Sequence, residues 1–146
     1  MIKINLIAVG KLKEKFFTEA VNEYKKRIQR FAEFNIVELD EDKTLEKEGE
    51  EILKKAKGYI IVTDVKGTLV DSPGIANIFE SALNNGKSEL SIIIGSSEGL
   101  CEKVKNRADK RISFGLVTYP HQLMRVILSE QIYRALTIMN HVTYHK

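Results

Sequence analysis

The chain has 146 residues, of which 43% are hydrophobic and 29% are charged. This length and apolar content suffice for one sizeable core but not comfortably for two, so we expect a single domain spanning residues 1–146. The formal net charge of +3 is compatible with an RNA partner but does not require one.

The sequence shows no membrane segment and no metal motif. No apolar run approaches the roughly 20 residues of a spanning helix, and Met1 to Gly10 lacks the features of a secretory signal peptide. We therefore expect a cytoplasmic protein. The single cysteine, Cys101, cannot form an internal disulfide and is interpreted as a small packing residue. Without spaced Cys/His ligands or a carboxylate cluster, no metal is expected.

Strands and helices alternate along the predicted chain. Apolar or β-branched runs predict strands at residues 2–9, 34–39, 59–62 and 90–94, with a fifth at 112–117 interrupted by Gly115. Helices are predicted at 16–31, 45–56, 72–84, 100–108 and 121–139. Ser72 is the expected cap of the third helix, because proline follows it. This order predicts an α/β fold with a parallel sheet covered on both faces.

The charged segment from Asp40 to Glu51 is rich in acids and lysine. Pairs of opposite charge four residues apart explain it as a solvated helix face better than as a binding tail. Lysines and arginines also gather at 11–15, 25–30 and 103–111. These three groups could extend an RNA footprint, or they could be ordinary solvated faces.

A glycine turn, Gly95-Ser96-Ser97-Glu98-Gly99, follows the buried strand 90–94 and precedes a helix. Glycine lets a ligand approach the backbone, and free amide groups at a helix start attract hydrogen-bond acceptors. The turn is neither G-x-G-x-x-G nor a Walker A loop, which argues against a dinucleotide or ATP site. Ligand binding and plain turn geometry both explain it.

The run from Phe114 to Tyr119 ends at Pro120-His121. Because proline lacks a backbone donor and fixes its own φ, the chain is expected to turn sharply from strand into helix. The turn would expose the peptide groups of Leu116 to Tyr119 at the sheet edge, where they could read a flat heterocycle. A proline in the first helical turn, with His121 near the cap, is the alternative explanation.

The last predicted helix, 121–139, carries few polar residues among many apolar ones. Glu130 and Arg134 are four apart and can pair on one helix surface, for a structural or a catalytic purpose. A helix with this many apolar residues is expected to be buried in the core of its own chain or in a subunit interface. The ending Tyr144-His145-Lys146 is of a kind that is usually inert. Its side chains could nevertheless stack on a base, move a proton and hold a phosphate.

In combination, these motifs resemble the RlmH family over the whole chain. The residues that carry the resemblance are Ile4 to Lys11, Ile94-Gly95-Ser96-Ser97-Glu98-Gly99-Leu100, Thr118-Tyr119-Pro120-His121-Gln122-Leu123-Met124-Arg125, Glu130-Gln131-Ile132-Tyr133-Arg134-Ala135 and Tyr144-His145-Lys146. Two positions depart from the family pattern: Ser96 replaces a usual glycine, and Thr143 replaces a frequent proline.

The resemblance implies a small SPOUT-class methyltransferase with a C-terminal trefoil knot in its parallel-sheet fold. Such an enzyme uses S-adenosylmethionine to methylate N3 of a pseudouridine in 23S rRNA on the assembled ribosome. The resemblance also implies a homodimer whose last helices pack together. The alternative from the residues alone is a non-catalytic RNA- or ribosome-binding module, which would bind RNA without the cofactor.

Matched by motif, the site residues fall into two groups. The implied cofactor pocket comprises Thr63, Gly95, Phe114, Gly115, Leu116, Val117, Thr118 and Tyr119. The implied substrate-binding or catalytic residues are Glu130, Arg134, Tyr144, His145 and Lys146. We hypothesise that His145, from this chain or a partner subunit, positions or deprotonates N3. Arg134 and Lys146 would hold phosphate or polarise the base.

Overall fold

The computed structural model describes residues 1–41 and 44–146. Within these residues the centre of the fold is a five-stranded sheet in the order β2-β1-β4-β3-β5, and every pairing is parallel. The strands are β1 (Ile2–Val9), β2 (Ala32–Leu39), β3 (Tyr59–Leu69), β4 (Glu89–Ile94) and β5 (Lys110–Ser113). Asp42 and Lys43, part of the charged segment considered above, lie outside the described residues.

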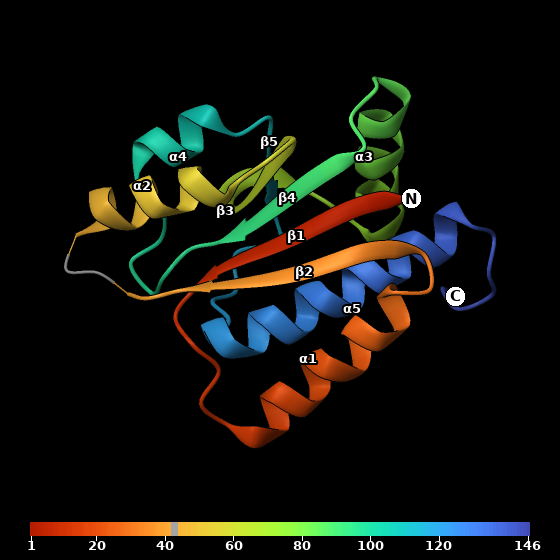
Figure 1. Cartoon of the computed structure of the whole chain (residues 1–146), viewed down its shortest axis with the longest axis horizontal. Helices are drawn as coiled ribbons and strands as arrows, with labels where there is room; N and C mark the ends of the chain where they lie inside the picture. Colours follow the sequence, from red (N-terminus) through yellow and green to blue (C-terminus); the bar gives the residue numbers. More distant parts are fainter. Residues whose placement is uncertain (42–43) are drawn as a thin grey trace.

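Helices cover both faces of this sheet (Figure 1). They are α1 (Lys15–Ile28), α2 (Leu45–Lys55), α3 (Ser72–Asn84), α4 (Glu102–Arg107) and α5 (His121–Met139). Side chains alternate between the two faces of a strand, so neighbours in β1 enter different cores. Leu6 packs in the cluster that includes residues of α1, α3 and α5, whereas Ile7 packs with residues of α2 and α4. The predicted parallel α/β architecture is confirmed.

The strands of the sheet centre are buried on both sides. In β4, Ile92, Ile93 and Ile94 are 1%, 0% and 5% exposed, although successive side chains point to opposite faces. A strand covered by helices on both faces has no solvated side, which explains its continuous apolar run. Because the strands are parallel, their carboxyl ends meet at one edge of the sheet.

Several predicted boundaries were wrong, each for a local reason. The fifth strand ends at Ser113 rather than at residue 117, because Gly115 adopts φ +106° and turns the chain out of the sheet. The third strand continues to Leu69, beyond an irregularity in its pairing with β5 between Thr63 and Thr68. Asp71, not Ser72, caps α3, since its carboxylate accepts a hydrogen bond from the Gly74 N–H at 2.8 Å.

Cys101 immediately precedes α4 and packs that helix against α2. It is half-buried, and its Sγ occupies the space into which a side chain at Gly49 would project. Among residues 1–41 and 44–146, no helix is long and apolar enough to cross a membrane. The same part of the chain contains no group of three or more His, Cys, Asp or Glu side chains able to hold a metal ion.

Candidate active site

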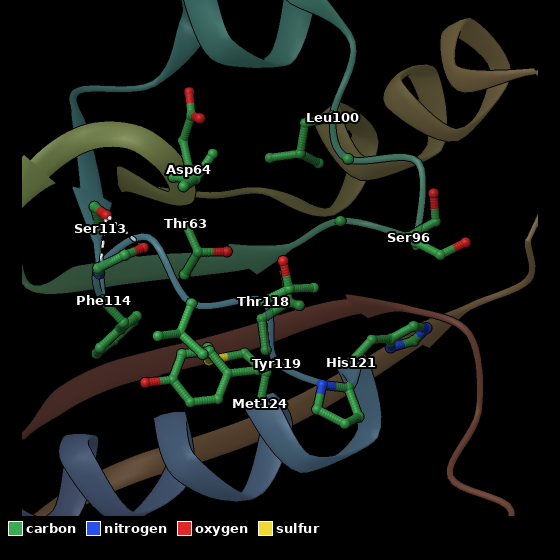
Figure 2. A pocket seen from close by; sticks show the side chains of 18 of the residues that line it. Thr63, Asp64, Ser96, Leu100, Ser113, Phe114, Thr118, Tyr119, His121 and Met124 are labelled. Atoms are coloured by element: carbon green, nitrogen blue, oxygen red, sulfur yellow. Dashed lines mark hydrogen bonds between the residues drawn. The ribbon is translucent and has the colours of Figure 1, made fainter.

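A cavity of about 400 Å³ opens at the carboxyl ends of β4 and β5 and beside residues 63–65 of β3, just beyond the part of β3 that pairs with β4 (Figure 2). Four segments form its walls: β3 around Thr63, the turn after β4, the loop after β5 and the first turn of α5. Ligands of open α/β sheets bind at this edge, and ligand pockets usually measure about 300–1,000 Å³. Position and size therefore identify this cavity as the candidate ligand site.

The cavity gathers most of the residues expected to hold a cofactor. Seven of the eight line it: Thr63, Gly95, Phe114, Gly115, Val117, Thr118 and Tyr119. Leu116 does not belong to the lining and is 88% exposed. Asp64, Ser96, His121 and Met124 also line the cavity, although they were not among the residues expected to hold a cofactor. For Asp64, Ser96 and His121 the available signal was their position next to Thr63, Gly95 and Pro120, and for Met124 it was its place one helical turn beyond Pro120.

The glycine turn after β4 is shaped by its own backbone. A Cβ at Gly95 would lie 2.5 Å from the carbonyl oxygen of Gly99, so no side chain fits there. Ser96, which replaces a glycine usual in the resembling family, is 9% exposed and donates a hydrogen bond to Glu48 at 3.0 Å. This bond ties the turn to α2. The geometric explanation of the glycine therefore holds. Because Gly95 also lines the cavity, ligand binding by this turn stays a prediction.

The loop after β5 offers free backbone donors. Its first residues are held by Ser113, whose hydroxyl accepts the Gly115 N–H at 3.1 Å. In the part of the chain that the structure describes, the four peptide N–H groups of residues 116–119 donate no hydrogen bond. Three of these four residues line the cavity. Unpaired N–H groups beside a cavity suit a ligand that presents hydrogen-bond acceptors.

Two side chains on β3 hold the opposite wall. Thr63 donates from its hydroxyl to the Ile93 carbonyl at 3.1 Å and so links β3 to β4. The side chain of Asp64 is only 8% exposed, lies 3.9 Å from the ammonium of Lys105 and accepts the Lys66 N–H at 3.0 Å. A negative charge thus stands at the cavity wall, with one cation in ion-pair range.

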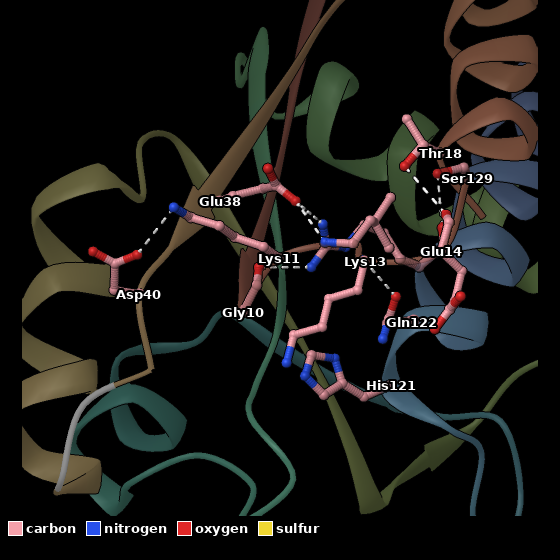
Figure 3. A network of polar contacts seen from close by, with 12 residues as sticks. Gly10, Lys11, Lys13, Glu14, Thr18, Glu38, Asp40, His121, Gln122 and Ser129 are labelled. Atoms are coloured by element: carbon pink, nitrogen blue, oxygen red, sulfur yellow. Dashed lines mark hydrogen bonds and ion pairs between the residues drawn. The ribbon is translucent and has the colours of Figure 1, made fainter. Parts of the chain in front are cut away.

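The first turn of α5 joins the cavity to the loop after β1 (Figure 3). Arg125 is 0% exposed, and its guanidinium donates to the Glu38 carboxylate and, at 3.0 Å, to the Gly10 carbonyl. The Lys13 N–H also donates to the Gln122 side chain at 2.9 Å. No local sequence pattern indicates a function for Arg125, and the structure shows that it anchors this loop.

His121 stands where this network meets the cavity. Its ring packs against Gly10, where an added Cβ would lie 2.9 Å from His121 Cε1. Its Nε2 is 3.7 Å from Glu41, whereas its Nδ1 is buried and finds no hydrogen-bond partner among the described residues. Buried polar atoms are nearly always hydrogen-bonded, so this unsatisfied nitrogen marks the wall of the cavity as a candidate ligand contact.

A second polar cluster lies on the other half of α5. Arg134 forms two hydrogen bonds to the Glu130 carboxylate, at 3.2 and 2.8 Å, and the Tyr144 hydroxyl donates to the same carboxylate at 2.7 Å. His145 Nδ1 lies 3.1 Å from an Arg134 nitrogen. The structure thus brings four of the five expected substrate residues together, while Lys146 is exposed at the chain end.

Docking of the tail is accompanied by raised pKa values of Tyr144 in the tail and of Arg134 on α5. Burial, reinforced by the hydrogen bond to Glu130, raises the pKa of Tyr144 to about 12. The same carboxylate, through its hydrogen bond, raises the pKa of Arg134 above its usual value. The ring of Tyr144 meets Tyr133 edge-on at 4.7 Å and lies under the Arg134 guanidinium at 4.8 Å. The tail is therefore docked on α5 even though Thr143 replaces a frequent proline.

The cavity and the tail cluster are separated along α5. Met124 lines the cavity and Arg134 holds the tail, ten positions further along the same helix. At about 1.5 Å per residue, this spacing corresponds to roughly 15 Å. Reacting atoms must approach to about 3–3.5 Å, so a tail docked in this way does not reach the cavity of its own chain.

The fold is a parallel sheet with a candidate ligand cavity at its carboxyl edge, and a loop of free N–H groups leads into the last helix. Comparison with known protein families identifies the class of protein that has these features. The family described as "Predicted SPOUT methyltransferase" matches residues 2–145, and this chain belongs to that family.

Individual relatives narrow the comparison. The chain is 45% identical to the ribosomal RNA large subunit methyltransferase H of Streptococcus thermophilus, across 99% of this chain and 100% of that protein. It is 43% identical, with the same coverage, to the protein of that name from Ruminiclostridium cellulolyticum.

Solved structures show the same fold at low sequence identity. The tRNA (m1G37) methyltransferase of Aquifex aeolicus aligns with a TM-score of 0.53 at 14% identity, covering 90% of this chain and 69% of that one. The SpoU methyltransferase AviRb of Streptomyces viridochromogenes, solved with AdoMet, aligns with a TM-score of 0.52 at 8% identity. That alignment covers 96% of this chain and 59% of AviRb.

Proposed function

We propose that this chain, as a single methyltransferase domain, methylates N3 of a pseudouridine in 23S rRNA on the assembled ribosome, with S-adenosylmethionine as methyl donor. The observation that carries the proposal is the cavity at the carboxyl edge of the sheet, in a chain of the SPOUT family. The name of the relatives, ribosomal RNA large subunit methyltransferase H, supports ribosomal RNA as substrate. The pseudouridine and the assembled ribosome follow from the resemblance to the RlmH family.

The residues around the cavity fit the cofactor. The free N–H groups of residues 116–119 would donate hydrogen bonds to acceptor atoms of the adenine. The unpaired Nδ1 of His121 would provide one more polar contact. The Asp64 carboxylate would favour the positive charge of the cofactor. S-Adenosylmethionine supplies a methyl group that its sulfonium already activates. The chain therefore has to orient two reactants and manage one proton.

The contact between Arg134 and His145 bears on how that proton is managed. A guanidinium can only donate, so His145 Nδ1 accepts in this contact. In a neutral His145 the hydrogen is then on Nε2, so Nε2 is a hydrogen-bond donor. Of the two hypothesised roles, this arrangement supports positioning the base through one of its carbonyl oxygens. Abstraction of the N3 proton by Nε2 would require the other tautomer. Arg134 and the exposed Lys146 remain the proposed partners of phosphate.

We further infer that the working unit is a homodimer. The separation of roughly 15 Å along α5 means that the tail of one chain has to serve the cavity of another if both act on one nucleotide. Large apolar side chains are exposed beside the cavity: Leu116 is 88%, Val117 69% and Leu123 37% exposed. A second copy packed against this region would cover them, which agrees with a helix α5 richer in apolar residues than one core needs.

Methyl transfer to ribosomes from cells that lack this protein tests the proposal. We expect the methyl group of labelled S-adenosylmethionine to appear in N3-methylpseudouridine of 23S rRNA, identified by mass spectrometry. If calorimetry shows no cofactor binding while the chain binds ribosomes, the non-catalytic RNA-binding alternative replaces the enzyme. Methylation at a different nucleotide would retain the enzyme and overturn the assigned position.

A further inference from the structure

The three lysine and arginine groups recognised in the sequence lie in different places relative to the tail. Group 103–111 belongs to α4 and β5, and α4 packs on the face of the sheet opposite to α1 and α5 (Figure 1). Group 11–15 lies beside the first turn of α5, at the far end of α1 from the tail, and two of its three lysines are paired with acids: Lys11 is 3.7 Å from Asp40, and Lys15 is 3.7 Å from Glu19. Group 25–30, at the end of α1, remains as the candidate neighbour of the tail.

The end of α1 is joined to the tail by a chain of tilted and edge-on ring contacts. The Arg27 guanidinium lies over two rings, 5.4 Å from the centre of Tyr24 and 5.8 Å from that of Tyr133. Tyr133 in turn contacts the Tyr144 ring edge-on. The Arg30 guanidinium lies 5.6 Å from the centre of Phe31, whose ring is 6.4 Å from Tyr133. Arg27 therefore contacts the ring that holds the tail directly, and Arg30 is linked to it through Phe31.

The two arginines differ in charge balance. Arg27 is paired with Glu23 at 2.8 Å, so part of its charge is neutralised. Arg30 is exposed, and within residues 1–41 and 44–146 no carboxylate lies in ion-pair range of it. Cations in the last turn of a helix offset its dipole, which accounts for Lys25, Lys26 and Arg27 without any ligand. Arg30 lies beyond Ile28, the last residue of the helix. The helix dipole therefore does not account for an unpaired cation at this position.

We propose that this end of α1, with Arg30 as the contacting residue and Arg27 as its neighbour, binds backbone phosphate of the ribosomal RNA next to the nucleotide held by the tail. The inference rests on the proposed function and extends its substrate site from α5 onto α1. Arginine suits the role because its guanidinium can meet a phosphate with two hydrogen bonds while one face rests on an aromatic ring. Arginine guanidinium groups and aromatic rings are also common in surfaces that bind RNA.

The test compares Arg30→Ala with Arg107→Ala in methyl transfer to ribosomes that lack the modification. Both variants remove one exposed arginine, but Arg107 is in the last turn of α4 on the opposite face. For Arg30→Ala we expect KM for ribosomes to rise about tenfold, as for the loss of one charge-assisted phosphate contact. The slope of log affinity against log salt should fall by about 1. We expect kcat to stay within about twofold and cofactor affinity to be unchanged. Arg30→Lys keeps the positive charge but not the paired N–H donors of the guanidinium, so it should recover part of the loss.

Equal KM values for Arg30→Ala, Arg107→Ala and the unaltered protein would overturn the inference, provided that the unaltered protein methylates ribosomes. A loss of kcat or cofactor affinity at unchanged KM would also overturn it, because it would place Arg30 in the support of the cavity. If the unaltered protein transfers no methyl group, the proposed function itself has failed. Binding of the three proteins to ribosomes without cofactor then decides on Arg30 separately.

Discussion

The hydroxyl of Tyr144 donates a hydrogen bond of 2.7 Å to the carboxylate of Glu130, although 14 residues separate them along the chain. The same carboxylate holds Arg134, and Arg134 in turn contacts His145. Glu130 is therefore the point that joins the C-terminal residues to α5. A Glu and Arg pair on a helix surface usually serves only to stabilise the helix. Here the pair of Glu130 and Arg134 also determines where His145 lies.

Removing this one hydroxyl should weaken substrate methylation without affecting the cofactor. In Tyr144→Phe, the ring contact with Tyr133 remains and only the bond to Glu130 is lost. One hydrogen bond contributes about 1 kcal/mol, so we expect kcat/KM for ribosomes to fall about fivefold. Calorimetry should show unchanged affinity for S-adenosylmethionine. Tyr59→Phe is the matched control, and an equal fall in both variants would contradict a role for the docked tail.

The phenol of Tyr144 should resist ionisation in the folded protein. Burial is the main reason that its pKa is raised to about 12, from an ordinary value of about 10. The folded state thus holds this proton more tightly than the unfolded chain. The corresponding stabilisation is complete below about pH 10 and is lost as the pH rises towards about 12. The ultraviolet difference spectrum between the unaltered protein and Tyr144→Phe measures the titration, and a midpoint near 10 would show that the tail is free.

Arg125 should matter to stability far more than an exposed arginine. It is 0% exposed and links α5 to Glu38 and to the Gly10 carbonyl. Arg125→Met removes both contacts at similar volume, and we expect the free energy of unfolding to fall by about 2 kcal/mol. Urea unfolding measures the change. Arg107→Met, on the exposed last turn of α4, should stay within about 0.5 kcal/mol of the unaltered protein. Equal midpoints for the two variants would refute the anchoring role.

The contact between Gly10 and His121 should connect the end of β1 to cofactor binding. Gly10 has φ +99°, and a Cβ there would lie 2.9 Å from His121 Cε1. We expect Gly10→Ala to lose on the order of 1–2 kcal/mol of stability through backbone strain. Because the ring of His121 must also move, affinity for S-adenosylmethionine should fall severalfold.

Gly86→Ala is the control for that prediction. Gly86 has φ +83°, and a Cβ there would meet nothing within 4 Å. This variant should therefore carry the backbone strain alone, with unchanged cofactor affinity by calorimetry. If both variants bind the cofactor as the unaltered protein does, the position of His121 has no influence on the cavity.

The cofactor loop should depend on the unusual backbone of Gly115. Its φ of +106° turns the chain out of β5, and an added Cβ would stand in open space. In Gly115→Ala the preferred backbone conformation changes, and the free N–H groups of residues 116–119 move with it. We expect cofactor affinity to fall about tenfold or more while the melting temperature changes little. A calorimetric affinity equal to that of the unaltered protein would argue against these N–H groups as ligands.

The sequence by itself determined the elements whose periodicity is strong. Helix α5 has the predicted bounds, residues 121–139, because Pro120 fixes its start and a long apolar run fills it. The parallel sheet followed from short, largely apolar strands such as β4, which ends in three buried isoleucines and fits a doubly covered sheet. Seven of the eight expected cofactor residues line one cavity, since strand ends converge in any parallel sheet. Their part in binding stays a prediction.

Only the tertiary structure decided which distant groups meet. Neither the burial of Arg125 against Glu38 nor the packing of His121 on Gly10 has a local signal, because each joins residues more than 80 positions apart. The tail looked inert by composition, yet Glu130, Tyr133 and Arg134 hold it on α5. Of three basic groups that were alike in sequence, only the one on α1 lies beside that tail. Local patterns specify strands and helices, whereas the neighbours of a polar side chain depend on how those elements pack.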